Sequence, residues 1–508
     1  MEKCVVVLDF GSTNVKAVAF DTAGGEIALS SCPKNKAVSP KPGWWEQDPR
    51  EVWAGTAKAI RGIFEKNIKP ENVLGVFATG QGNGLISVDK NRNPVGMGIV
   101  SVDSRAQPIV DAWRNENLLS AVHPTLGMSV YAGGPLSLMA WLRENSPERY
   151  GRTDKILFAK DWINFKLSGV VGTDRTDASG AGLMDIRKDE YAFEVFDLLG
   201  MKGIADKLPS LHFSHEKIGT VTKEAAAETG LLEGTPVMGG AHDLGAFPFG
   251  VGTTDSKQLV SVIGTWGFNL FPVKNPDGYS LAFTHSVPGY FLTGIGDPNS
   301  GACLDKVIDI LCEHEKVQAT MKNISVHDYI EDMIIGLEPS GIVFHPYLFA
   351  NIFSVNASAG FYGVKNWHTK ADLLRAVYEG IIMGHYANIK TIPGNEKFES
   401  IWLIGGGAKS RVLGQIFADV TGLGVKIPVT DEVTGRGGAL NALVGLGVYK
   451  SHEEAAIPVG VKTEFKQDPN RRDFHSRKFD IFRELITHNM EIWNRLGELK
   501  NYGQEEAK

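Results

Sequence analysis

The chain has 508 residues, which is too long for one hydrophobic core, so at least two domains are expected. Its 52 lysine and arginine residues face 59 aspartate and glutamate residues, and without a basic stripe nucleic acid is not expected as a partner. The 4 cysteines are too few for a disulfide framework, and none forms a CxxC pair. No charged leader precedes an apolar stretch and no apolar run approaches ~18 residues, which predicts a cytoplasmic protein with no membrane partner.

The first predicted element is a β-hairpin over residues 5–21, "VVVLDFGSTNVKAVAFD". After the turn Gly11-Ser12-Thr13 the apolar residues recur with a period near two, which indicates a returning strand rather than a helix. The backbone N–H groups of the turn and its two hydroxyls could form a concavity for an anion. Asp9, just before the turn, would face that anion and hold Mg²⁺. The alternative is a tight surface turn that Asp9 caps.

Strand-like and helix-like segments then alternate along the first half of the chain. Asp48 as N-cap and Pro49 in the first helical position predict a helix in "DPREVWAGTAKAIRGIFEK". A buried strand follows in "NVLGVFATGQGNG", helices are expected over 134–151 and 161–169, and residues 234–252 predict a strand, a turn and a helix. Such alternation is typical of an α/β domain with helices on the faces of its sheet.

Near residues 252–257 the pattern restarts. "QLVSVIGTWGFNLFPV" again places a Gly-Thr turn between two apolar strands, so it resembles the opening hairpin in form. This weak internal repeat predicts two domains, residues 1–250 and 251–508, each with one Gly-Ser/Thr hairpin turn. An amphipathic helix over 479–499 is expected to pack back on the body of the protein.

A third glycine site, "LIGGGAKSRVLGQIFADVTG", ends a buried strand and opens a helix, and its glycines let a flat ring or sugar approach the backbone. It also allows a dinucleotide-binding interpretation, with Asp431 or Glu432 as the acidic residue. Against that interpretation, Ser410 replaces the third glycine and the motif lies late in the chain. No Walker GxxxxGK[ST] sequence is present.

In combination, these stretches resemble the FGGY carbohydrate kinases, a family built on the actin/hexokinase-like ATPase fold. "LDFGSTNVKAVAFD" is similar to the family's first phosphate hairpin, "IGTWG" to its second and "IGGGAKS" to its adenosine loop. Residues 360–380, "GFYGVKNWHTKADLLRAVYEG", fit the C-terminal signature, and "GGPLSLMAWLREN" fits the N-terminal one except that Leu138 replaces its usual lysine. The resemblance covers essentially the whole chain. It implies two α/β, ribonuclease H-like ATPase domains with a catalytic cleft between them.

The resemblance implies that ATP is the phosphate donor, that Mg²⁺ assists, and that the two hairpins hold the phosphates. Asp9 is the implied metal ligand. The implied ATP-binding residues are Gly11, Ser12, Thr13, Lys16, Gly264, Thr265, Gly301, Gly405, Gly406, Gly407 and Ala408.

"VMGGAHDLGAF" resembles the family's strand-end segment whose aspartate takes the proton of the sugar hydroxyl, which points to Asp243 as the catalytic base. From the residues alone, Asp243 is an N-cap for the helix that begins at Leu244. The neighbouring His242 is expected to shape the substrate pocket.

Sugar specificity is expected in "ATGQGNGL" and "SVDSRA". The first aligns with a loop that carries a Met-His pair in D-xylulose kinases and an Arg-Glu pair in glycerol kinases, where this chain has Gly82-Asn83 after Gln81. Asp103 is either a substrate ligand or the structural ion-pair partner of Arg105. Tyr131 either forms a wall of the pocket or is plain core. The implied substrate-binding residues are Gln81, Gly82, Asn83, Asp103, Tyr131, His242 and Asp243.

The stretches "TGQGNGL", "DKNRNPVG", "SVDSRA" and "SPERY" are most similar to the L-xylulose kinase branch, whereas "LDFGSTNVKAVA" and "GAHDLGAFPFG" are similar in part to L-fuculose kinases. The implied function is ATP-dependent phosphorylation of a ketopentose such as L-xylulose, or of a related ketose or polyol. L-Fuculose, erythritol and D-xylulose remain alternative substrates. A non-catalytic sugar or nucleotide sensor of the same fold is an alternative of another class, and a homodimer is one assembly that the sequence leaves open.

Overall fold

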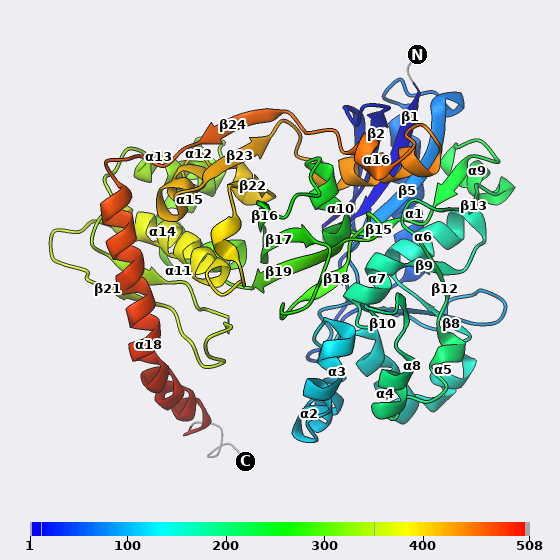
Figure 1. Ribbon diagram of the computed structural model, residues 1–508, viewed down its shortest axis with the longest axis horizontal. Helices are drawn as coiled ribbons and strands as arrows, with labels where there is room; N and C mark the ends of the chain where they lie inside the picture. The colour runs from blue at the N-terminus through cyan, green and yellow to red at the C-terminus, as the bar shows by residue number, and fades with distance from the viewer. Residues whose placement is uncertain (1–2, 12, 350, 503–508) are drawn as a thin grey trace. The chain divides into compact units, whose positions relative to one another are not determined.

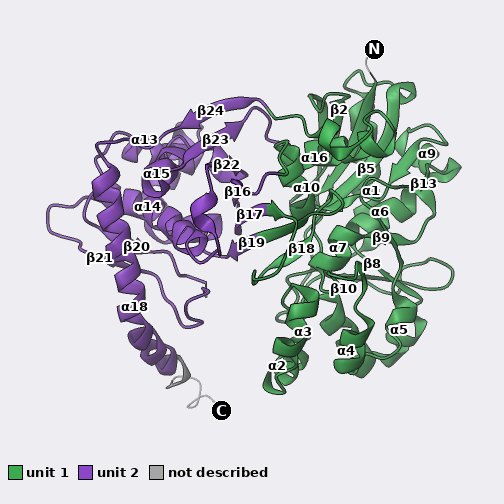
Figure 2. Cartoon of the chain, in the orientation of Figure 1, with its two compact units in different colours: residues 1–254, 272–293, 432–459 green, residues 255–271, 294–431, 460–508 purple. Residues whose placement is uncertain are grey.

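A computed structural model describes residues 3–11, 13–349 and 351–502 of the chain (Figure 1). They form two compact units (Figure 2). Unit 1 comprises residues 1–254, 272–293 and 432–459, and unit 2 comprises residues 255–271, 294–431 and 460–508. The chain leaves unit 1 near the expected boundary at residue 250, but residues 272–293 and 432–459 return to it.

Unit 1 is built around a mixed sheet with the strand order β13-β14-β5-β1-β2-β3, in which β15 also pairs with β5. Strands β1 and β2 form the expected antiparallel hairpin, and β1 pairs in parallel with β5. The bounds are β1 (Cys4–Phe10), β2 (Asn14–Asp21), β3 (Glu26–Pro33), β5 (Val73–Gly80), β13 (Lys217–Thr220), β14 (Pro236–Met238) and β15 (Ala241–His242).

Helices cover both faces of this sheet, because the side chains of β1 alternate between two apolar cores. Val6, Leu8 and Phe10 belong to the core that contains α1 residues, whereas Val5 and Val7 belong to the core that contains α10 and α16 residues. Asp9 has the register of Val5 and Val7, which places it on the face of α10 and α16. The bounds are α1 (Pro49–Phe64), α6 (Ala159–Ser168), α9 (Lys223–Thr229), α10 (Asp243–Gly250), α16 (Val433–Gly445) and α17 (His452–Ala455).

The rest of unit 1 is a lobe of short elements with its own apolar core. The helix expected over 134–151 is divided into α4 and α5, because Pro147 disfavours helical backbone at Ser146. The helices are α2 (Gln107–Asn115), α3 (Leu118–Leu126), α4 (Pro135–Asn145), α5 (Pro147–Arg152), α7 (Arg175–Gly180) and α8 (Phe193–Leu198). The short strands are β4 (Glu46–Gln47), β6 (Ile86–Val88), β7 (Gly98–Ile99), β8 (Lys155–Leu157), β9 (Gly172–Asp174), β10 (Met184–Asp185), β11 (Glu190–Tyr191), β12 (Ser210–His212) and β18 (Ala282–Thr284).

Unit 2 repeats the beginning of unit 1. Its strands β16 and β17 form an antiparallel hairpin, and β16 pairs in parallel with β22, as β1 does with β5. The sheet continues from β22 through β23 to β24. The strands are β16 (Gln258–Ile263), β17 (Gly267–Val273), β19 (Phe291–Asp297), β20 (Val343–His345), β21 (Gly360–Tyr362), β22 (Ser400–Ile404), β23 (Gly424–Pro428) and β24 (Val461–Phe465).

The helices of unit 2 are α11 (Gly301–Leu311), α12 (Glu313–Met321), α13 (Val326–Ile334), α14 (Lys370–Ile389), α15 (Leu413–Thr421) and α18 (Arg472–Tyr502). Helix α18 packs on the unit as expected: Lys478 lies 2.5 Å from Glu379, and the Phe482 carbonyl oxygen lies 3.0 Å from Nε2 of His345. Within the described part of the chain, no helix has the length and apolarity needed to cross a membrane.

Candidate active site

Three strands of unit 1 bring the predicted catalytic and metal-binding carboxylates to the same edge of the sheet. Asp9 on β1 and Ala241 on β15 both stand opposite Thr79 of β5. Because all three strands run in parallel, their carboxyl ends meet at one edge. Asp243 opens α10 immediately after β15, and the loop that begins at Gln81 follows β5.

Asp9 is a half-buried carboxylate among other charges. Burial and, next, the charge of Asp243 raise its pKa to about 7, although Lys16 acts in the opposite direction. Lys16 on β2 lies 2.7 Å from Glu432, the residue before α16. Asp9 is therefore held in a locally acidic environment that an added cation would relieve.

Asp243 lies where both of its expected neighbours can contact it. Its Oδ1 accepts a hydrogen bond of 2.7 Å from the backbone N–H of Leu244 and lies 3.3 Å from Nε2 of His242. Burial raises the pKa of Asp243 and lowers that of His242, so the imidazole is neutral at neutral pH. Both contacts reach Oδ1, which leaves Oδ2 as the oxygen to meet a ligand.

Gly82 lies against the same histidine. A Cβ at Gly82 would stand 2.5 Å from Cδ2 of His242 and 2.7 Å from Oδ1 of Asp177. The loop can approach His242 only because residue 82 has no side chain. The amide oxygen of the next residue, Asn83, is buried without a hydrogen-bond partner, so it is available to a ligand donor.

Asp177, which the sequence did not predict, lies beside this loop. It belongs to a fully buried cluster in which Lys160 lies 2.5 Å from Asp161, 3.1 Å from Asp174 and 3.3 Å from Asp177. Oδ1 of Asp177 has no hydrogen-bond partner, and burial raises the pKa of this carboxyl well above its ordinary range, although the charge of Lys160 acts in the opposite direction. The pattern "GTDRTDASG" contains Asp174 and Asp177, but neither it nor the preceding pair Lys160-Asp161 indicates that the four side chains meet.

Asp103 is already engaged within the protein. Its carboxylate accepts two hydrogen bonds of 2.9 Å from the Arg105 guanidinium and one of 2.6 Å from the backbone N–H of Trp45. Asp103 and Arg105 are both buried, so the geometry favours the structural alternative for Asp103. Tyr131 is 40% exposed and therefore is not core, but it does not line the cavity beside Gln81.

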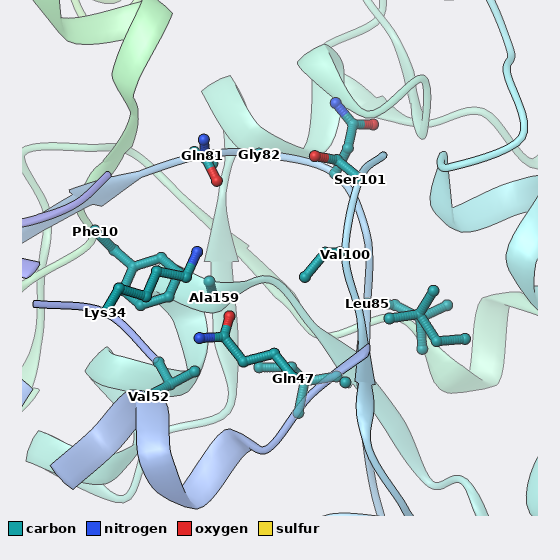
Figure 3. A pocket seen from close by; sticks show the side chains of 14 residues that line it. Phe10, Lys34, Gln47, Val52, Gln81, Gly82, Leu85, Val100, Ser101 and Ala159 are labelled. Carbon is teal, nitrogen blue, oxygen red and sulfur yellow. The ribbon is translucent and has the colours of Figure 1, made fainter. Parts of the chain in front are cut away.

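Behind the loop lies a small cavity of about 40 Å³, drawn in Figure 3. Gln81, Gly82 and Asn83 line it, so the structure brings the predicted specificity loop to a hollow. Lys34 and Gln47, which the sequence analysis did not select, also face it (Figure 3).

The two hairpin turns are similar in their backbone hydrogen bonds. Gly11 N–H donates to the Asn14 carbonyl over 3.1 Å, and Gly264 N–H donates to the Trp266 carbonyl over 3.2 Å. Thr13 is exposed beside the first turn, and Ser12 lies outside the described residues.

Unit 2 contains a larger pocket of about 420 Å³ beside the second turn, within the size range of small-molecule sites. Five predicted ATP-binding residues line it, whereas Gly405 and Ala408 do not. The first five are Gly264, Thr265, Gly301, Gly406 and Gly407. Three residues that the sequence did not predict also line this pocket: Tyr378 from α14, His327 from α13 and Ser410 from the segment before α15.

Both halves of the chain match models of a known protein family. Residues 4–250 match the model of the N-terminal domain of the FGGY family of carbohydrate kinases, and residues 259–446 match that of its C-terminal domain. The chain belongs to the FGGY family.

Relatives of this FGGY kinase are similar to it over nearly their whole length. The L-xylulose/3-keto-L-gulonate kinase of Escherichia coli (strain K12) is 31% identical, over 94% of this chain and 96% of the relative. The xylulose kinase of Staphylococcus epidermidis (strain ATCC 12228 / FDA PCI 1200) is 28% identical, over 96% and 97%. The crystal structure of xylulose kinase from Rhodospirillum rubrum superimposes with a TM-score of 0.84 at 24% identity, over 97% and 100%.

These comparisons confirm the expected fold class, two actin/hexokinase-like α/β domains, and the expected enzyme class. This FGGY kinase phosphorylates a sugar, with ATP as the phosphate donor of its family.

Proposed function

We propose that this FGGY kinase phosphorylates a ketopentose, with L-xylulose as the first candidate and a related ketose or polyol as the alternative. The observation that carries the proposal is the loop at Gly82-Asn83. It has neither the Arg-Glu pair of glycerol kinases nor the Met-His pair of D-xylulose kinases. Its glycine makes room beside His242, and its asparagine offers a buried, unpaired acceptor to a hydroxyl. The similarity to an L-xylulose/3-keto-L-gulonate kinase supports the same choice.

Asp243 is the general base of the proposed reaction. A bond forms between the sugar hydroxyl oxygen and the γ-phosphorus, the bond from that phosphorus to the bridging oxygen breaks, and ADP leaves. The hydroxyl proton passes to Oδ2 of Asp243, while His242 and the Leu244 N–H hold Oδ1 in place. The glycine turns at Gly11 and at Gly264 are the proposed ligands of the ATP phosphates, because backbone N–H groups in such turns favour phosphate oxygens.

Asp9 is the proposed protein ligand of Mg²⁺, directly or through water. The fit rests on the charges near Asp9, where Asp243 and Glu432 both raise its pKa and a dication would relieve the repulsion. No group of three or more acids, histidines or cysteines suited to a metal occurs among the described residues. Such a site suits Mg²⁺, which takes one or two carboxylates and completes its shell with phosphates and waters. When bound, the ion would neutralise phosphate charge.

The substrate proposal is tested with one coupled ADP-release assay over L-xylulose, D-xylulose, L-fuculose, erythritol and glycerol. We expect L-xylulose or a related ketose to rank above glycerol and D-xylulose in kcat/KM, since glycerol would lose the charge-assisted hydrogen bonds of an Arg-Glu pair. Glycerol or D-xylulose at the top would contradict the assignment of the loop.

Asp243→Asn tests the base in the same assay. The variant should bind ATP normally and lose turnover by orders of magnitude, because the lost group acts on the transition state. Asp206→Asn, at an exposed acid of the same unit, is the matched control. Retention of more than about a tenth of wild-type kcat, a loss of only ~1.4 kcal/mol, would show that Asp243 is not the base.

A further inference from the structure

Unit 1 contains a second cavity, which shares no lining residue with the cavity beside Gln81. Its volume is about 180 Å³, which is room for about a dozen waters at roughly 10–15 Å³ each, and a pentose has about ten non-hydrogen atoms. Three of its walls are aromatic side chains: Phe213, Tyr290 and Phe291.

The charged side chains that line this cavity are already paired within the protein. Nε–H of Arg175 donates to Asp189 over 2.9 Å, and the guanidinium of Arg187 lies 2.6 Å from Asp277. The guanidinium carbon of Arg175 lies 4.0 Å from the centre of the Phe213 ring, and its terminal nitrogens form no hydrogen bond with a described residue. Because the charges balance, a neutral ligand with hydrogen-bonding groups suits the cavity better than an ion does.

His285, another lining residue, has a hydrogen-bond donor without an acceptor. The residue is 2% exposed, and Nδ1 of its ring accepts a hydrogen bond of 2.8 Å from the Val287 N–H. Burial lowers the pKa of His285 to about 3, so at neutral pH the ring is neutral and carries its proton on Nε2. Nε2 is buried without a partner among the described residues, which is costly unless a ligand supplies an oxygen.

We propose that this cavity is a second binding site for a neutral sugar, whose hydroxyl oxygens accept hydrogen bonds from Arg175 and from Nε2 of His285. The same hydroxyls can donate to Asp189, since a hydroxyl is both donor and acceptor. The aromatic walls would cover the carbon chain, in a pocket that combines apolar surface with a few polar groups. The inference goes beyond the proposed function and rests on it only for the choice of L-xylulose as the sugar.

The wall of this cavity is joined to the candidate active site. The backbone N–H of Thr284 donates to Oγ of Ser179 in α7 over 2.8 Å. The preceding residue, Phe283, packs on His242 with 6.0 Å between the ring centres, and His242 contacts Asp243. A sugar that binds against Thr284 and His285 is therefore expected to change turnover at Asp243.

Equilibrium dialysis of radiolabelled L-xylulose, without ATP, counts the sugar sites on each chain. We expect wild-type protein to have the site beside Gly82 and a second site. Arg175→Gln should raise the Kd of the second site about tenfold or more, as for lost hydrogen bonds from a charged group. The Kd of the first site should change less than about threefold.

Two further variants accompany this measurement. Phe213→Ala removes an aromatic wall but leaves the Arg175-Asp189 ion pair in place, and it should also weaken the second site alone. Arg152→Gln, at an exposed arginine of α5 in the same unit, is the matched control and should leave both affinities unchanged.

Steady-state kinetics test the connection to the active site. The rate of the wild-type enzyme should depart from a single hyperbola at the sugar concentrations that fill the second site, whereas Arg175→Gln should follow one hyperbola. A single hyperbola for wild-type enzyme with both sites filled would overturn the connection through Thr284 and Phe283.

Two binding results would overturn the proposal. One is an equal number of sites with equal affinities in wild type and Arg175→Gln. The other is inorganic phosphate that binds in place of the sugar and is lost in Arg175→Gln, which would make the cavity an anion site. One site in wild type and none in Arg175→Gln would keep this proposal and contradict only the proposed function.

Discussion

Asp9 and Asp243 receive their properties from their positions at the carboxyl ends of β1 and β15, two strands that both pair in parallel with β5. Each follows an apolar segment, so each is carried to the edge of the sheet and partly desolvated there, and burial raises both pKa values. The charge of Asp243 raises the pKa of Asp9 further, because two carboxylates that share an edge repel each other. A cation is therefore worth more at Asp9 than at an isolated surface acid.

Asp9→Asn tests whether Asp9 helps to bind the magnesium ion. The amide keeps the shape and loses the charge, so we expect the magnesium concentration for half-maximal turnover to rise about tenfold or more, as when a buried charge interaction is lost. Binding of the sugar, measured without ATP, should change much less. Asp206→Asn serves again as the control, and a magnesium titration identical to wild type would remove Asp9 from the metal site.

The candidate site residues that the sequence predicted are those whose signal is local. The Asp9 turn, the His242-Asp243 pair and the Gly82-Asn83 loop each lie in one short stretch, and the structure places all of them at or near one sheet edge. Asp177 and Lys34 were not predicted, because their surroundings come together only in the fold. Lys34 has no unusual neighbours in sequence, and the cavity that it lines is assembled from six separate segments, around residues 10, 34, 47–52, 81–86, 98–101 and 159.

Among the elements, α10 and α16 cross so closely that only glycine fits between them. A Cβ at Gly437 of α16 would overlap the carbonyl oxygen of Ala246 in α10, and one at Gly250 would overlap the Val433 carbonyl. The glycines that this close packing requires lower the helix propensity of the segment "EVTGRGGALNALVGLG". Packing against α10 nevertheless makes it the buried helix α16. The contact matters for the site, because α10 begins at Asp243.

Gly437→Ala is predicted to destabilise unit 1 by about 2 kcal/mol or more, since the overlapping atom is backbone and one helix must move. A lower midpoint of thermal unfolding, together with a higher KM for sugar, would report that movement. Gly151→Ala is the matched control, because Gly151 is a helical glycine with nothing within 4 Å of an added Cβ. That control should be neutral or stabilised by about 0.5–1 kcal/mol. Equal stability of the two variants would mean that the helices do not cross as closely as described.

At the scale of the whole molecule, the division into units follows contacts that no single stretch reveals. Residues 432–459 come late in the chain yet supply α16 to the sheet that begins at Cys4. Composition does not change where the chain returns to unit 1, so a linear boundary near residue 250 was the division that a sequence could suggest. The alternation of strands and helices was enough to predict the α/β class, because the period of the hydrophobic residues can be seen within a short stretch of sequence.

Buried histidines give the molecule a pH dependence of definite sign. Burial lowers the pKa values of His345 and His452 to about 4 and that of His285 to about 3. An unfolded chain protonates these rings near pH 6.5, so it binds more protons than the folded chain as the pH falls below that value. Each of these histidines therefore lowers the free energy of unfolding as the pH falls from 6.5 to the pKa of the ring in the folded protein. Carboxylates with a raised pKa, such as Asp9 and Asp243, have the opposite effect on stability. The pH dependence of the whole protein's stability therefore does not report the histidines alone.

His285→Asn isolates one of these contributions. The His285 ring is 2% exposed, and its Nδ1 accepts a hydrogen bond of 2.8 Å from the Val287 N–H, which the asparagine Oδ1 can also accept. At pH 7.5 the two proteins should differ only by packing. At pH 4.5 wild type should have lost about 2.5 kcal/mol relative to the variant, which shifts the unfolding midpoint of a unit of this size by roughly 4 °C. Midpoint differences that stay constant from pH 7.5 to 4.5 would show that His285 titrates alike in the folded and unfolded chains.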